Sequence, residues 1–218
     1  MRFVLLAPLA FFALGCPENP PAQPNDSGPP APDAECAAGV LGDVTKDIAF
    51  DFRVLHIDGT DNPVNDGEDV ALILPPQGGR VVFVGVRATN LDGCAVTLTG
   101  AIRDETSNQA VFDKRTVNLT ATGDGWGTSG AAVQSISAAR EAYANVPLCP
   151  NQWATTDIFD HEFKLEVTLE DRAKRKLMKS IRVTPRCAEP DKRAECLCIC
   201  KQGYVLGEKC AADAGGDT

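Results

Sequence analysis

The chain has 218 residues and a mass of 23.1 kDa, a length that allows one domain with additional segments. Its 21 basic and 30 acidic residues give a formal net charge of −9, which argues against a nucleic-acid-binding protein because such proteins need a basic surface. The hydrophobic fraction of 44% argues against a disordered chain. Nine cysteines favour an oxidising compartment, and their odd number leaves one for a separate role.

The beginning of the chain has the pattern of an export signal. Met1 and Arg2 precede an apolar run over residues 3–14, which is too short to span a bilayer because about 20 residues are needed. Such a run is typical of a signal peptide. It ends in Ala13-Leu14-Gly15-Cys16, which resembles the lipobox of bacterial lipoproteins. This resemblance implies that residues 1–15 are removed and that Cys16 carries the lipid; the alternative is an ordinary signal peptide with a chance cysteine.

The lipidated cysteine and a proline-rich segment account for residues 16–36. Residues 17–35 contain seven of the 15 prolines and no Leu, Ile, Val or aromatic residue, so they favour an extended spacer rather than a folded unit. The lipoprotein resemblance implies attachment to a membrane. Because Pro17 stands where an Asp often signals retention in the inner membrane, we expect the outer membrane, facing either the periplasm or the cell surface.

Residues 37–187 show the alternation of half-buried β-strands. Strands are expected over residues 48–54, 81–86, 96–102, 111–119, 163–169 and 177–183. The run 81–86 is continuously apolar, which indicates a strand covered on both faces. Asp171-Arg172-Ala173 is expected to close a hairpin, and residues 135–145 favour a short helix. The fold class predicted is all-β: an antiparallel two-sheet β-sandwich, Ig-like or fibronectin-like.

The C-terminal region, residues 188–218, is rich in cysteine. It contains Cys198-x-Cys200-x-x-Gly203-Tyr204 followed by Cys210, which resembles the C-terminal half of an EGF-like module. The resemblance implies a Cys200–Cys210 disulfide. A zinc site is the alternative, although an exported chain favours disulfides.

With Cys16 assigned to lipid, eight cysteines remain, an even number that is consistent with four disulfides. If the strands are assigned correctly, Cys94 and Cys149 lie at the same end of the sandwich, so we expect them to pair. Cys36 or Cys187 would then attach the tail to the domain. The eight are Cys36, Cys94, Cys149, Cys187, Cys196, Cys198, Cys200 and Cys210.

The acidic segment over residues 58–69 is the candidate ligand site. Its carboxylates are the hard oxygen ligands that Ca²⁺ takes, but the segment does not match the EF-hand spacing. Turn composition is the alternative explanation. The carboxylates proposed as ligands belong to Asp58, Asp61, Asp66, Glu68 and Asp69, and no other cofactor is expected.

Motifs for catalysis are absent from the sequence. It has no G-x-S-x-G, H-E-x-x-H or P-loop motif, and its two histidines are His56 and His161. Trp126 and Trp153 are candidates for sugar stacking, with a core position as the alternative. The basic run 172–179 is a candidate contact for an anionic partner, such as a polysaccharide or lipid head groups, with a solvated turn as the alternative.

These observations favour a lipid-anchored cell-envelope protein with a non-enzymatic Ig-like module for binding or structure. Its expected partners are the membrane, through the lipid, and another envelope protein or a glycan, not nucleic acid. Two alternatives remain open. One is an exported hydrolase of carbohydrate or peptide on a β-sandwich scaffold, and the other is a Ca²⁺-dependent adhesive module.

Overall fold

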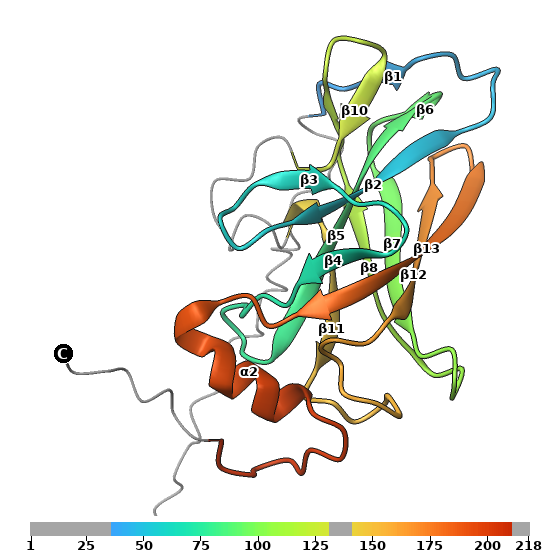
Figure 1. Ribbon diagram of the computed structural model, residues 1–218. Helices are drawn as coiled ribbons and strands as arrows, with labels where there is room; N and C mark the ends of the chain where they lie inside the picture. Colours follow the sequence, from blue (N-terminus) through green and yellow to red (C-terminus); the bar gives the residue numbers. More distant parts are fainter. Residues whose placement is uncertain (1–35, 131–140, 211–218) are drawn as a thin grey trace, which may run out of the picture. The chain divides into compact units, whose positions relative to one another are not determined.

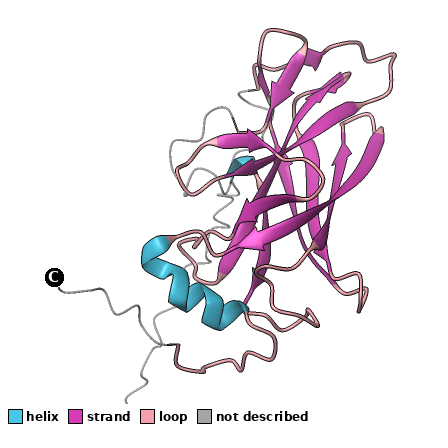
Figure 2. Cartoon of the chain, viewed as in Figure 1, coloured by secondary structure: helices cyan, strands magenta, loops and turns pink. Residues whose placement is uncertain are grey.

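The alternating strands of the sequence form two packed β-sheets in a computed structural model that describes residues 36–130 and 141–210 (Figures 1 and 2). The described residues belong to one compact unit. The first sheet has the order β3 (Asp61–Pro63), β2 (Ala49–Leu55), β5 (Arg80–Thr89), β10 (Trp126–Thr128) and β9 (Thr120–Ala121), with β11 (Ala144–Cys149) also paired to β5. The second has the order β4 (Glu68–Ala71), β13 (Lys176–Arg186), β12 (Phe163–Glu170), β7 (Val96–Arg103) and β8 (Ala110–Val117). A separate pair joins β1 (Val40–Leu41) to β6 (Leu91–Asp92).

The core lies between the two sheets and follows the alternation of the strands. Every second residue of β7 and β12 is buried, and these side chains share one apolar cluster with the inward residues of β5. Gly100 of β7 lies where the two sheets approach closely: a Cβ there would lie 3.1 Å from Val146 Cγ2 and 3.2 Å from Val84 Cβ. The expected two-sheet all-β sandwich is therefore confirmed.

Strand β5 is covered on both faces, as its continuous apolar run predicts. Its second face packs in a smaller cluster with Tyr143, with the last residues of β2 and β4, and with Ile73, which follows β4. The cluster consists of Leu55, Ala71, Ile73, Val81, Phe83 and Tyr143. The central strand of the first sheet thus has apolar side chains on both sides.

The two long sides of the sandwich differ. On one side, β11 of the first sheet contacts β8 of the second, and the Asn145 N–H donates to Asp113 Oδ2 over 2.7 Å. On the other side, β13 pairs with β4 only over Val183–Arg186. This leaves the part of β13 before Val183 as a sheet edge facing β2.

Three features differ from the expected fold. The second sheet is not wholly antiparallel, because β4 runs parallel to β13. The acidic segment is not a single loop: it supplies β3 to the first sheet and the start of β4 to the second. Of the helix expected over residues 135–145, residues 135–140 lie outside the described part of the chain, Glu141 and Ala142 are helical, and the last two residues begin β11.

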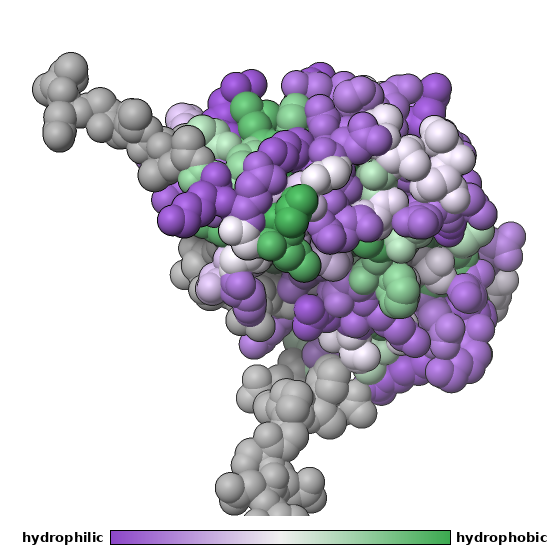
Figure 3. Space-filling view, turned by 90° about the horizontal axis from the view of Figure 1, so that it is seen from below, coloured by the Kyte–Doolittle hydropathy of each residue, from purple (hydrophilic) through white to green (hydrophobic). Residues whose placement is uncertain are grey.

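The cysteine-rich tail contains a helix that the sequence analysis did not predict. A 3-10 turn, η2 (Pro190–Lys192), leads into α2 (Arg193–Cys200), which lies near the lower ends of β5 and β11 in Figure 1. Among the described residues, no helix has the length and apolarity required to cross a membrane. The outer surface at this end is mostly hydrophilic, with small separate hydrophobic areas (Figure 3).

Candidate functional site

The five carboxylates proposed as Ca²⁺ ligands are distributed over both sheets and each has a partner in the protein. Asp66 pairs with Arg182 at 2.7 Å and Asp69 with Arg186 at 2.9 Å. These pairs fix residues 64–67, which cross from β3 to β4 and are called the crossing segment, and the start of β4 to β13. Glu68 accepts the Asn65 N–H at 2.7 Å, and Asp58 accepts the Thr60 N–H at 2.9 Å. These four carboxylates therefore stabilise the chain where it passes from the first sheet to the second.

Asp61 belongs to a half-buried network on the first sheet. Its Oδ2 accepts from Arg53 Nε at 2.9 Å, and its Oδ1 accepts from the Tyr143 hydroxyl at 3.0 Å. Burial of Tyr143, reinforced by the Asp61 charge, raises the pKa of its phenol above the ordinary value. The Asp61 carboxylate therefore faces Arg53 and Tyr143 and does not converge with the other four carboxylates.

Hydrogen bonds hold the pKa of three carboxyls in the segment below their usual values. The main causes are the Thr60 side chain for Asp58, the Arg182 side chain for Asp66 and the Asn65 N–H for Glu68. A group that donates a proton in catalysis needs a raised pKa instead. Within residues 36–130 and 141–210, the acidic side chains form no cluster with metal-ligand spacing.

The eight cysteines from Cys36 onward form four disulfides, as their number predicts. The pairs are Cys36–Cys94, Cys149–Cys200, Cys187–Cys196 and Cys198–Cys210. The tail is attached to the sandwich through Cys149 and Cys187, whereas Cys36 joins the N-terminal segment to Cys94 in the turn between β6 and β7.

Both individual pairings expected from the sequence are wrong. Cys149 lies beside Arg80 at the beginning of β5, whereas Cys94 follows the end of β5; ten residues of strand separate these ends by about 30 Å. The EGF-like pairing of Cys200 with Cys210 is also wrong. Since α2 is helical, Cys196 and Cys200 lie on one face, which is buried, while Cys198 is partly exposed and pairs with Cys210.

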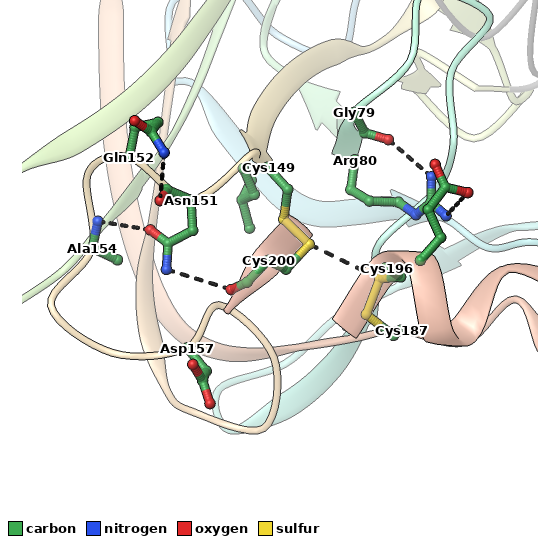
Figure 4. Close-up of a disulfide and its surroundings, with 12 residues drawn as sticks. Gly79, Arg80, Cys149, Asn151, Gln152, Ala154, Asp157, Cys187, Cys196 and Cys200 are labelled. Atoms are coloured by element: carbon green, nitrogen blue, oxygen red, sulfur yellow. Dashed lines mark hydrogen bonds and ion pairs between the residues drawn. A yellow bond between two sulfur atoms is a disulfide. The ribbon is translucent and has the colours of Figure 1, made fainter. Parts of the chain in front are cut away.

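Two of the disulfides lie side by side under α2 (Figure 4). Cys196 Sγ lies 4.0 Å from Cys200 Sγ, and the sulfurs of Cys187, Cys196 and Cys200 all lie within 4.8 Å of one another. This is the one group of metal-ligand spacing in the described part of the chain, and its sulfurs are bonded as disulfides.

A buried arginine at the start of β5 holds the tail beside this sulfur group. Arg80 has no exposed surface, and its Nη2 donates to the Lys192 main-chain oxygen at 3.2 Å. Its guanidinium also lies 3.8 Å from Glu189 and 3.5 Å from Glu195. This contact has no local signature in the sequence, because the tail residues lie more than 100 positions from Arg80.

The remaining aromatic and histidine candidates lie apart from one another. Trp153 packs on the core against Phe163, and its Nε1–H donates to Leu148 O at 3.0 Å, so it has the core position given as its alternative. Trp126 is partly exposed, with the Arg87 guanidinium 4.5 Å above its ring. The exposed His161 has its Nδ1 3.1 Å from Phe159 O, and His56 pairs through its backbone with Thr60.

A groove with a volume of about 660 Å³ lies on the open side of the sandwich. Its walls are β2, the crossing segment and β13. The residues that line it include Asp51, Pro63, Val64, Arg87 and Ser180. It was not anticipated from the sequence, since it depends on how far β4 covers β13. The groove lies between the edges of the two sheets, at β2 and β13, and its lining includes both acidic and basic side chains.

The basic run at residues 172–179 is divided between structural and exposed positions. Arg175 donates to Val44 O at 2.7 Å and to Asn90 O at 2.9 Å, and pairs with buried Asp171 at 2.7 Å. It therefore holds the hairpin against two distant loops. Lys174 and Lys176 are exposed.

Comparisons with protein-family models, curated proteins and solved structures give no match for this chain.

Proposed function

We propose that this chain is a lipid-anchored protein of the bacterial cell envelope, held at the outer membrane through Cys16. Its disulfide-bonded sandwich is a non-enzymatic module for binding or for structure. The observation that carries the proposal is the cysteine pairing. All eight cysteines from Cys36 to Cys210 pair among themselves, so no other cysteine of the chain remains for Cys16.

The attachment of the N-terminal segment to the sandwich supports this role. Cys36 directly follows the proline-rich segment and is bonded to Cys94, while the Gly93 N–H donates to Gly39 O at 2.8 Å. Strand β1 then pairs with β6. A force applied through the anchor would therefore reach the sandwich through a covalent bond and a short sheet.

Metabolic labelling with an alkyne-bearing fatty acid in a Gram-negative host tests the anchor. The full chain should take up the label and fractionate with the outer membrane, and Cys16→Ser should lose both properties. A double Cys198→Ser/Cys210→Ser variant is the matched control, because it removes two cysteines without changing Cys16 and should keep the label. Uptake of label by Cys16→Ser, or exported full chain without label, would overturn the proposal.

A further inference from the structure

The outer face of the second sheet gathers positive charge in an acidic protein. The registers of β8, β7, β12 and β13 place alternate residues of all four strands on this face. Its charged residues are Arg103, Lys114, Lys164, Lys176, Arg182, Glu166 and Glu170, with Lys174 in the adjoining hairpin and Asp66 paired to Arg182. We call this set the basic face.

The cations of the basic face exceed the carboxylates available to them. Glu166 is shared by Arg103 and Lys164, each at 3.0 Å. Glu170 pairs with Lys174 at 3.0 Å. The two remaining lysines, Lys114 on β8 and Lys176 on the unpaired part of β13, are exposed and lie close enough to Glu170 to lower its pKa further. With the Arg182–Asp66 pair, six cations thus stand against three carboxylates, although the whole chain has a net charge of −9.

Hydroxyl groups and one exposed ring lie among these charges. The same outward positions carry Thr97, Thr99, Thr116, Thr168 and Ser180. Phe112 is 66% exposed and stands opposite Ala101 in the register, so a small neighbour leaves space over its ring. The negative face of an aromatic ring attracts the polarised C–H groups of a sugar. The face combines donors for hydroxyls, cations for carboxylates and an apolar platform.

We propose that the basic face binds an extended acidic polysaccharide carrying carboxylate groups. This inference rests on the proposed binding role of the module and names its partner, but it does not depend on the anchor. A polymer suits the geometry because Lys114 and Lys176 lie on strands three positions apart, about 14 Å at the usual strand spacing. A single sugar residue does not span that distance, whereas an extended chain contacts both.

Neither the net charge of the chain nor the exposed apolar residues of the basic face argue against a glycan ligand. The net negative charge of the chain does not prevent binding, because at physiological ionic strength charges more than about 8 Å away are largely screened. A lipid surface fits the face less well than a glycan. The exposed apolar residues Phe112 and Met178 lie on the two outer strands, with the polar rows of β7 and β12 between them, and so they form no continuous wedge for insertion.

The test measures binding of the full chain, in mild detergent, to immobilised polygalacturonate, with neutral dextran and phosphatidylglycerol vesicles as comparison surfaces. We expect binding to polygalacturonate alone, weakening as salt rises. The charge-reversed variant Lys114→Glu/Lys176→Glu should bind about tenfold more weakly, since each reversal removes one attraction and adds one repulsion. Lys192→Glu/Lys209→Glu has the same net charge but lies on the tail, where both residues are exposed, and should bind as the unmodified chain does.

The ring is tested separately by Phe112→Ala, with Leu206→Ala as a control at another exposed apolar residue. Only the first should weaken binding, and neither should change the melting temperature. Equal losses in the two charge variants would indicate attraction to net charge and overturn the inference. Binding to the vesicles in place of polygalacturonate would also overturn it. Fatty-acid labelling of Cys16 is measured independently, so failure of the glycan proposal and failure of the anchor proposal are distinguishable.

Discussion

Lys179 Nζ donates a hydrogen bond to the main-chain oxygen of Phe50 over 2.6 Å and connects the edges of the two sheets on the open side of the sandwich. The ammonium group also lies 5.1 Å from the Phe50 ring centroid and 5.5 Å from that of Phe52. Lys179 thus has an inward register position, opposite Val167, on the unpaired part of β13, although its side chain remains exposed on the open side. An inward-pointing charge at such an edge opposes pairing with a strand of another molecule.

Replacement of this lysine should destabilise the fold and expose the edge. We expect Lys179→Ala to lower the free energy of unfolding by about 1 kcal/mol, because a hydrogen bond and cation–π contacts are lost. Lys176→Ala, on the same strand but outward and exposed, should change it by less than about 0.5 kcal/mol. Urea denaturation gives both values, and light scattering should show self-association of Lys179→Ala alone. Equal stabilities would contradict a bridging role.

The strands of the core were predictable because their side chains alternate locally. The buried residues of β7 and β12 stand at every second position, which is the period of a strand with one solvated face. The apolar run of β5 indicated cover on both faces, and Tyr143 with Ile73 supplies the second cover. In each case the signal lies within a few consecutive residues.

The candidate site was not predictable in the same way, because its contacts join residues far apart. Asp66 and Arg182 are separated by 116 positions, and no local pattern shows that this aspartate will pair with an arginine rather than a cation. The EGF-like pattern likewise ignores the helical backbone of α2. The position of Cys200 on the buried face, and not its spacing to Cys210, determines its partner.

The buried Tyr143 predicts a loss of stability in alkaline solution. Its pKa is raised in the folded protein by burial first and by Asp61 second, while an unfolded tyrosine ionises near pH 10. The folded state therefore retains a proton that the unfolded state loses above about pH 10, so this group reduces the free energy of unfolding as the pH rises further.

The variant Tyr143→Phe removes this ionisation and isolates its effect. Between about pH 9 and pH 11 its stability should fall less steeply than that of the unmodified chain, although at neutral pH it should be about 1 kcal/mol less stable for loss of the Asp61 hydrogen bond. Urea denaturation across this range measures both effects. Parallel pH profiles would show that Tyr143 does not contribute to the alkaline loss.

The partners of the acidic segment predict that Ca²⁺ does not stabilise the protein. Binding at 100 times the dissociation constant would stabilise it by about 2.7 kcal/mol, which corresponds to a rise of several degrees in melting temperature. Because Asp66 and Asp69 pair with Arg182 and Arg186, we expect the same melting temperature in millimolar Ca²⁺ and in EDTA. A rise of several degrees with Ca²⁺ that Asp58→Asn abolishes would restore the Ca²⁺ hypothesis.

The neighbouring disulfides under α2 predict exchange when one cysteine is removed. In Cys149→Ser the Cys200 thiol is released 4.0 Å from Cys196 Sγ. Its thiolate can attack that sulfur, forming a Cys196–Cys200 bond and releasing the Cys187 thiolate, with no external oxidant. Alkylation followed by peptide mapping should therefore find free Cys187 at mildly alkaline pH. Cys149→Ser/Cys200→Ser lacks the attacking thiol and should keep Cys187–Cys196 intact. If Cys200 alone is alkylated in the single variant, the two disulfides do not exchange and their proximity serves only to pack the tail.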